Sequence, residues 1–238
     1  MKEMILNIKK KLGLLKNEDM ADYYRAKGIK IGKGTYFFST DIIVDTQRPY
    51  MVEIGEYCKI TKGVIILQHD YSRSVLRRKY GEIIGESKKT TIGNNVFIGV
   101  NSVILMGSNI GDNVIIGAGS VVSGNVPNDV VIAGNPAKKI CSLSEYRTKR
   151  KNKYIQEAYL TAECFYSKYK RYPLPRELGA FWPIFMQKDL QAIKDNKINT
   201  TLNGDDPSEA LSYWLNSKEK QPFKSYDSFI KFVKEQKQ

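Results

Sequence analysis

Between Thr91 and Pro136 the apolar positions of the chain recur every six residues. One aliphatic residue occupies the same position of each step without a slip: Ile92, Ile98, Ile104, Ile110, Ile116 and Val122. This period fits neither a helix, at about 3.6 residues per turn, nor a strand, with a period of about 2. It predicts a chain that turns a corner after every short strand and points each aliphatic side chain inward. Three steps complete a coil, and coils stack at about 4.8 Å as a β-solenoid.

Two other positions of the repeat are restricted as well. Glycine directly follows four of the six aliphatic residues, at Gly93, Gly99, Gly111 and Gly117. We expect these glycines to supply backbone angles that a side chain would resist. The fifth residue of each step is small or β-branched: Val96, Ser102, Ser108, Val114, Ser120 and Val126.

The stretch Ile92 to Ile140 carries a family resemblance. It reads IGNNVFIGVNSVI, then IGDNVIIGAGSVV, then VPNDVVIAGNPAKKI, and is similar to the last coils of galactoside, maltose and xenobiotic O-acetyltransferases. It resembles the hexapeptide-repeat acyltransferases, and the resemblance implies a mainly β fold, a left-handed parallel β-helix. The similarity is looser from Ile31 to His69 and does not cover Cys141 to Gln238. The family implies the left hand, which the period alone would not give.

Residues 1–28 are predicted to be helical, with Gly13 as a weak point. Five apolar residues lie at helical spacing among lysines: Met4, Ile5, Ile8, Leu12 and Leu15. Such a segment can pack against the end of the solenoid. It can instead be a basic amphipathic helix that touches an anionic membrane surface.

Residues 29–140 are predicted to form the solenoid. Its first coils carry Ile31, Phe37 and Ile43, then Ile54 and Ile60, at the six-residue step. The register shifts at residues 46–50, which predicts an irregular corner. Residues 68–90 interrupt the repeat and contain the only histidine of the chain. Long irregular loops within compact repeats are usually functional.

Residues 141–238 lose the repeat and are predicted to be a helical appendage, with helices at residues 144–170, at residues 206–214 and from residue 225. Sixteen of the 26 aromatic residues lie here. They can form the core of the appendage, or some of them, such as Trp182 or Trp214, can stack on sugar rings of an acceptor.

The composition limits the chemistry. The net charge of +13 predicts an anionic partner, such as nucleic acid, an acidic membrane surface or a phosphorylated ligand. Three scattered cysteines without a CxxC motif and a single histidine argue against a disulfide framework and a metal site. We therefore expect no metal and a cytoplasmic protein, possibly peripheral at the inner membrane face. No apolar run approaches the ~20 residues of a membrane span.

The resemblance implies acetyl-coenzyme A as co-substrate and His69 as the general base. His69 opens the loop at the point where these acetyltransferases carry their catalytic histidine, and imidazole is well suited to accept a hydroxyl proton near neutral pH. The main-chain N–H of Val100 matches the oxyanion donor. Asp45 or Asp41, from a preceding coil, can reach the ring or the acceptor, and Asp70 is the sequence neighbour of His69.

The resemblance also implies a coenzyme-binding set. Phe97 matches a bulky position near the cofactor, Gly99 precedes the oxyanion turn, and Ala118 matches a backbone contact to the pantetheine arm. Lys138 and Lys139 match a basic position that faces the phosphates. Ser123-Gly124 departs from the family, because many relatives carry Thr-Lys or Thr-Arg there, so one cationic contact is missing.

These observations predict an acetyl-coenzyme A-dependent O-acetyltransferase that acts on a sugar hydroxyl of a surface polysaccharide or its precursor. The family implies a homotrimer with His69 at a subunit interface. A xenobiotic O-acetyltransferase, or an N-acetyltransferase acting on a nucleotide-linked amino sugar, is the alternative within the same chemistry. The alternative of another class is a non-catalytic scaffold that binds nucleic acid or membrane. For the enzyme we expect a saccharide acceptor and no nucleic acid.

Overall fold

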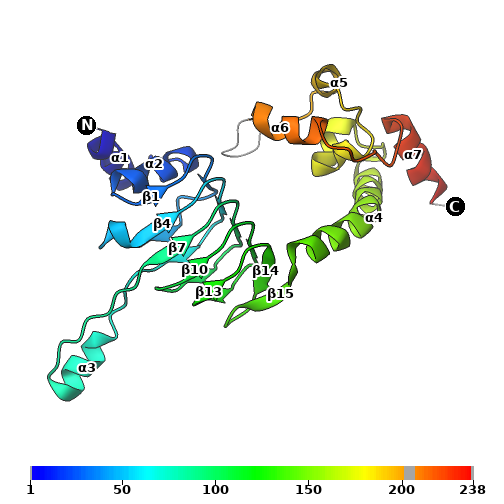
Figure 1. Cartoon of the computed structure of the whole chain (residues 1–238). Coiled ribbons are helices and arrows are strands. Elements are labelled where there is room, and N and C mark those ends of the chain that lie inside the picture. Colours follow the sequence, from blue (N-terminus) through cyan, green and yellow to red (C-terminus); the bar gives the residue numbers. More distant parts are fainter. Residues whose placement is uncertain (1, 201–206, 237–238) are drawn as a thin grey trace. The chain divides into compact units, whose positions relative to one another are not determined.

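The computed structural model describes residues 2–200 and 207–236, which divide into two compact units. The first unit runs to Tyr146 and contains all the strands, and the second begins at Arg147 and is helical. The solenoid is drawn from blue to green in Figure 1 and the helical unit from green to red.

The helical elements of the described residues are as follows: α1 (Lys2–Lys11), η1 (Asn17–Asp19), α2 (Met20–Ala26), η2 (Pro49–Met51), α3 (Arg73–Tyr80), α4 (Leu143–Tyr169), η3 (Pro175–Ile184), α5 (Leu190–Asp195), α6 (Pro207–Leu215) and α7 (Tyr226–Glu235). The strands are mostly two residues long: β1 (Lys30–Ile31), β2 (Tyr36–Phe37), β3 (Ile43–Val44), β4 (Val52–Ile54), β5 (Lys59–Ile60), β6 (Ile65–Ile66), β7 (Thr90–Ile92), β8 (Phe97–Ile98), β9 (Val103–Ile104), β10 (Asn109–Ile110), β11 (Ile115–Ile116), β12 (Val121–Val122), β13 (Asn125–Val126), β14 (Val130–Ala133) and β15 (Lys138–Ser142).

The strands form three sheets, one for each face of the solenoid. The strand orders are β1-β4-β7-β10-β13, β15-β14-β11-β8-β5-β2 and β12-β9-β6-β3. All neighbours are parallel except β14 and β15. The aliphatic residue of each step therefore stacks on its counterpart in the next coil, as Ile60 stacks on Ile98 and Ile98 on Ile116, and all three are fully buried. This is the parallel β-helix that the six-residue period predicts.

The fifth residue of each step is buried at a corner. Ser102, Ser108 and Ser120 are fully buried, and each hydroxyl donates to a backbone carbonyl, as Ser120 does to Gly117 at 2.6 Å. Valine fills the same position at Val96, Val114 and Val126 without a polar group. An unpaired buried hydroxyl would be costly, so serine is tolerated because its hydroxyl bonds a backbone carbonyl.

The expectation for the glycines that follow the aliphatic residues was wrong. Gly93, Gly99, Gly111 and Gly117 do not have positive φ. They are glycines because the next coil is too close, since a Cβ on Gly99 would lie 2.5 Å from the backbone nitrogen of Ala118. The left-handed backbone falls two residues later in each step and is taken by asparagine or glycine: Asn95, Asn101, Gly107, Asn113 and Gly119.

The register of the first coil also differs from the prediction. Ile43 is 56% exposed, whereas Ile42 and Val44 are buried. Val44 pairs with Ile66, so it is the inward residue of β3. One extra residue between Phe37 and Val44 shifts the six-residue step, and a shift by one residue turns a strand over.

The N-terminal segment is not one helix. Gly13, with φ of 66°, separates α1 from η1 and α2. Among the described side chains of α1, only Leu6 is buried. Of the five apolar residues at helical spacing, Leu15 is partly buried against the core of the first unit and four are exposed: Met4, Ile5, Ile8 and Leu12. Two lysines of α1 contact the neighbouring helical segments, because Lys9 pairs with Asp19 of η1 at 3.1 Å and Lys10 lies 4.5 Å from the Tyr23 ring centroid of α2.

The C-terminal unit has its own core. It consists of buried aliphatic and aromatic side chains from α4, η3, α5 and α7 and the segments between them. Phe229 is fully buried and lies 5.4 Å from the Phe185 ring in a stacked geometry and 5.3 Å from Phe223 edge to face. Most aromatic residues of this unit are therefore core residues.

Candidate active site

His69 and Asp45 meet where two neighbouring coils leave the same sheet. Asp45 directly follows β3, and His69 lies three residues after β6, the strand paired with β3. The His69 Nδ1 makes a short hydrogen bond to Asp45 Oδ2. The two side chains are only 10% and 9% exposed, so the bond is largely shielded from water. Stacking of two coils thus brings together residues that are 24 positions apart.

The Asp45 carboxyl is held as a carboxylate. Burial raises its pKa, but the Gln47 N–H, His69 and the Gln68 amide all donate to it, so the pKa is lowered overall. The Gln47 N–H bonds Oδ1 at 3.0 Å, while His69 bonds Oδ2. A charged acceptor on Nδ1 keeps the proton of a neutral imidazole at Nδ1 and leaves the lone pair on Nε2.

Two residues that sequence reasoning missed orient this pair. The amide of the fully buried Gln68 donates to the Asp45 carboxylate, and its amide oxygen accepts from Ser87 Oγ at 2.7 Å. Ser87 comes from the far end of the loop, and its backbone bridges with His69. A polar residue directly after the apolar run VIIL was the one available signal for Gln68. Nothing in the sequence pointed to Ser87.

The other ring nitrogen of His69 is available. Nε2 is buried and has no hydrogen-bond partner among the described residues. Buried polar atoms are nearly always paired, so an exception needs an explanation. A hydroxyl group of a bound molecule would satisfy Nε2, and Nε2 could then take its proton. The exposed Tyr71 ring lies 5.1 Å from the imidazole, in an edge-to-face geometry.

The remaining predicted carboxylates are not joined to His69. Asp70 forms a local turn just before α3, where it accepts from the Ser72 N–H at 2.9 Å and from the Ser72 hydroxyl at 2.7 Å. These bonds, the hydroxyl bond first, lower the Asp70 pKa. Asp41 is exposed, and no bond between its side chain and His69 exists in the described part of the chain.

Most of the predicted coenzyme residues lie in one row across successive coils. Gly99 and Ala118 follow the paired strands β8 and β11, and the Gly119 N–H donates to the Val100 carbonyl at 2.8 Å. Ala133 at the end of β14 pairs with Lys138 of β15. Phe97, at 42% exposure, points outward from β8. Val100, Ala118, Lys138 and Lys139 are exposed, so the row is open to a ligand.

The row and the histidine belong to different corners of the solenoid. Val100 follows a strand of the six-stranded sheet, whereas His69, Asp45 and the exposed Ser123 follow strands of the four-stranded sheet. One face, about six residues or roughly 20 Å of extended chain, separates the two corners. The Val100 N–H donates to no acceptor in the described ranges, so it remains available.

Within residues 2–200 and 207–236 no three His, Cys, Asp or Glu side chains gather in a way that could hold a metal ion. None of the helices described is both long enough and apolar enough to cross a membrane.

Comparisons with known proteins cover the solenoid. Residues 89–124 match the family model described as bacterial transferase hexapeptide (six repeats). Protein CapG of Staphylococcus aureus is 43% identical over 163 residues, which are 68% of this chain and 92% of that protein. Galactoside O-acetyltransferase of Escherichia coli is 39% identical over 117 residues, 49% of this chain but only 55% of that enzyme.

A solved structure of a hexapeptide-repeat-containing acetyltransferase from Vibrio cholerae aligns at 25% identity and a TM-score of 0.47, over 60% of this chain and 90% of that one. The family match, together with the three parallel sheets, confirms the prediction of a left-handed β-helix with helices at both ends.

Proposed function

The chain belongs to the bacterial hexapeptide-repeat transferases and is an acyltransferase, and on that premise we propose that it transfers an acetyl group from acetyl-coenzyme A to a sugar hydroxyl. The observation that carries the proposal is the Asp45–His69 pair with its unpartnered Nε2. A base that is held in one tautomer and whose Nε2 is unpaired is what a hydroxyl nucleophile requires.

In the proposed reaction, His69 Nε2 takes the proton of the acceptor hydroxyl as its oxygen attacks the thioester carbonyl carbon. The Asp45 carboxylate stabilises the imidazolium that forms. A main-chain N–H, assigned to Val100, stabilises the oxyanion of the tetrahedral intermediate. The carbon–sulfur bond then breaks, and the leaving thiolate takes the proton from His69. The products are the O-acetyl ester and free coenzyme A.

We assign the coenzyme to the row of Phe97, Val100, Ala118 and Lys138. Its main-chain amides and small side chains suit the extended pantetheine arm, and Lys138 with its neighbour Lys139 suits the phosphates. Both lysines are exposed on β15 and extend the row at its end. Ser123 lies on the other corner, so in one protomer it is separate from this row.

The separation of the two corners supports the homotrimer. A base and an oxyanion donor that act on one carbonyl group must lie within a few ångströms of it, since both touch the reacting atoms. Within one protomer they sit on corners separated by a whole face of the solenoid. A second copy that brings its Val100 corner against the His69 corner would complete the site.

We propose a surface polysaccharide, or its precursor, as the acceptor. Similarity to an enzyme that acetylates galactosides supports a sugar hydroxyl. A xenobiotic hydroxyl, or the amine of a nucleotide-linked amino sugar, would use the same base, and product masses would distinguish them. A catalytically silent scaffold has no use for an oriented imidazole with a free Nε2.

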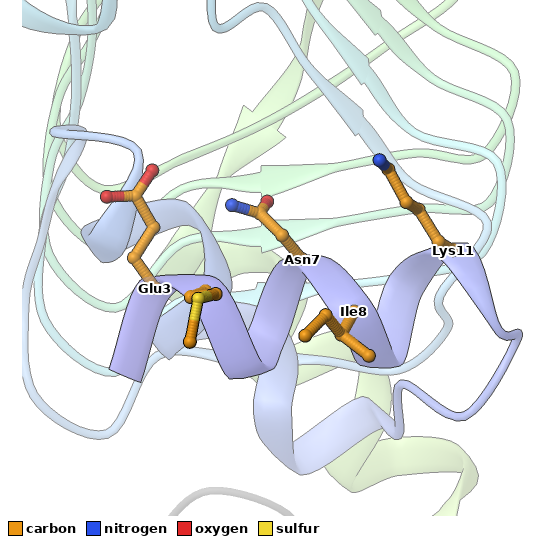
Figure 2. A pocket seen from close by; sticks show the side chains of 5 residues that line it. Glu3, Asn7, Ile8 and Lys11 are labelled. Atoms are coloured by element: carbon orange, nitrogen blue, oxygen red, sulfur yellow. The ribbon is translucent and has the colours of Figure 1, made fainter. Parts of the chain in front are cut away.

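The cytoplasmic location and a contact with the inner membrane face remain predictions. The exposed apolar residues of α1 support the contact. Figure 2 shows Ile8 on one side of the helix and Glu3, Asn7 and Lys11 on the neighbouring side. Flotation with anionic lipid vesicles would test it, and a protein that stays at the bottom of the gradient would refute it.

The test is thioester loss from acetyl-coenzyme A in the presence of a sugar panel, measured for the parent protein and for His69→Ala. We expect acceptor-dependent turnover that falls about 10²–10⁴-fold in the variant. Ser74→Ala, an exposed change in the same loop, serves as the matched control and should retain the parent rate. A thermal shift with coenzyme A reports binding independently of turnover.

Turnover that survives His69→Ala would mean that the base is misassigned. Coenzyme binding without turnover on any acceptor would reject the sugars of the panel. A protein that does not bind the coenzyme would overturn the enzyme in favour of the scaffold.

A further inference from the structure

The helical unit contains a hollow that the acyl-transfer site does not use. It has a volume of about 460 Å³, within the range of ligand sites in proteins. Its walls come from α4, the end of η3, α6 and the segment at residues 217–222, all of which belong to the second unit. Because it lies within one unit, its shape is a property of that unit alone.

The segment at residues 217–222 is fixed as one wall by ion pairs and hydrogen bonds. Glu219 accepts from Arg147 at 2.8 Å and from Lys151 at 2.5 Å, both on α4. Lys188, from the opposite side, donates to Ser217 Oγ at 2.8 Å and to the carbonyl oxygen of the same residue. This wall is therefore held at Glu219 by α4 and at Ser217 by Lys188.

Backbone contacts extend this attachment. The Gln221 side-chain amide donates to the Met186 carbonyl, and the Phe223 N–H donates to the Ile184 carbonyl at 3.0 Å. Ile184 is buried and lines the hollow. A ligand would meet a preformed wall and would not have to order it, which lowers the entropic cost of binding.

The base of the hollow is apolar and aromatic. Trp214 and Tyr154 are half-buried and line it together with Ile155 and Pro183. The Trp214 ring meets Trp182 edge to face, at 4.8 Å and 74°. Trp182 therefore does not lie parallel to Trp214 in a stack. The Tyr154 hydroxyl is already bonded to the Ala180 carbonyl at 2.8 Å, so Tyr154 offers its ring and not a donor.

The polar part of the lining is positively charged. It carries Lys151, Lys188 and Lys220 against the single carboxylate of Glu219, a net charge of +2. Lys220 is exposed and has no partner among residues 2–200 and 207–236. Lys188 keeps one of its three N–H donors beyond the two used on Ser217.

We propose that this hollow binds an acidic saccharide. A pyranose ring has an apolar face of C–H groups that fits an indole ring, and a rim of hydroxyl groups that fits lysine and amide side chains. A carboxylate or phosphate substituent would pair with Lys188 and Lys220. A flat aromatic ligand fits less well, because the Trp182 and Trp214 rings cross at 74° and leave no slot between parallel rings.

The inference deepens the proposed function and rests on it for one point: that the bound saccharide is part of the acceptor chain. The helical unit would hold that chain while another part of it reacts at His69. Binding itself can be measured without turnover, so the two proposals can fail separately.

The experiment uses the full chain and two trisaccharides of similar size, the acidic trigalacturonate and the neutral maltotriose. Calorimetry measures affinity, and intrinsic fluorescence locates the site, because the only two tryptophans of the chain are Trp182 and Trp214. We expect saturable binding of trigalacturonate that changes tryptophan emission, and binding of maltotriose at least tenfold weaker.

Three variants test the assignment. Lys220→Gln and Lys188→Gln should each weaken trigalacturonate binding about three- to tenfold, and Trp214→Phe should weaken both saccharides. Lys194→Gln removes the same charge from the exposed surface of α5, away from the hollow, and should leave the affinity within twofold. His69→Ala should bind trigalacturonate like the parent even though its turnover is lost.

Absence of saturable binding would overturn the proposal, as would an equal loss in Lys194→Gln and Lys220→Gln. Uridine monophosphate serves as a competing probe. If it binds at the tryptophans and trigalacturonate does not, the site is a nucleotide site and the saccharide proposal is wrong. Because Lys220 is exposed, its substitution should not disturb folding, so it decides the matter should Trp214→Phe be unstable.

Discussion

The two units of this protein build their cores in opposite ways. In the solenoid a single aliphatic residue of each step packs on its equivalent in the next coil, as Ile98 does on Ile116. In the helical unit Phe229 packs on Phe185 and Phe223, residues from unrelated segments at irregular separations. A periodic core repeats the same local environment, whereas an irregular core makes each contact once. The hollow proposed to bind a saccharide lies in the irregular unit, where no two stretches of its lining repeat one another.

The comparison predicts where single truncations are most costly. Phe229→Ala removes a fully buried ring with two aromatic neighbours and should lower the free energy of unfolding of the helical unit by about 3–5 kcal/mol. Tyr213→Ala, at a ring that is 72% exposed, should change it by less than about 0.5 kcal/mol. Urea unfolding followed by tryptophan fluorescence measures this, because both tryptophans lie in the helical unit. Equal losses in the two variants would contradict the assigned core.

The solenoid departs from its repeat at Asp45 and His69, the pair proposed to be catalytic. Asp45→Asn keeps the shape of the side chain but replaces the charged acceptor of His69. A hydrogen bond to a charged group is worth about 1.5–3 kcal/mol, so turnover should fall roughly tenfold to a hundredfold. Asp195→Asn, an exposed carboxylate of α5, is the matched control. A full parent rate in Asp45→Asn would remove Asp45 from the mechanism.

The same variant has a pH signature. The Asp45 pKa in the folded protein lies below its ordinary value of 3.8. The carboxylate therefore stabilises the fold at pH values above 3.8, and this stabilisation is lost as the pH falls through the folded pKa. The difference in unfolding free energy between the parent and Asp45→Asn should be larger at pH 7 than at pH 3. A difference that grows on acidification would contradict the direction of the shift.

The smallest expected loss of stability comes from replacing single glycines of the solenoid, where one glycine avoids a close contact and another adopts a left-handed backbone. Gly99→Ala would place a Cβ 2.5 Å from the Ala118 backbone nitrogen and should cost about 1–3 kcal/mol, as overpacking does. Gly119 has φ of +68°, but a Cβ added there would meet no atom within 4 Å in the described structure. Gly119→Ala should cost about 1 kcal/mol, because only the left-handed backbone, and no close contact, opposes the added methyl group. Unfolding followed by circular dichroism ranks the two, and the reverse order would refute the close-approach explanation.

The predictability of the fold follows the same division. The six-residue period sufficed for the three sheets, the inward aliphatic residues and the small corner residues, because each coil repeats contacts at a fixed sequence separation. It failed at Ile43, where one extra residue in the first coil turns the strand over. The period also gave the wrong reason for the glycine at Gly99, because the sequence of one coil does not reveal how closely the next coil approaches it.

For the site, the sequence by itself determined the loop, the only histidine and a short set of carboxylates that could orient it. It could not choose among Asp41, Asp45 and Asp70, because the choice depends on which of them lies at the end of the strand that stacks beside β6. Only the tertiary structure decided for Asp45, and only it revealed Gln68 and Ser87 behind the pair. The physical reason is that a periodic pattern determines which residues stack, whereas hydrogen bonds across a loop depend on how its two ends return to the solenoid.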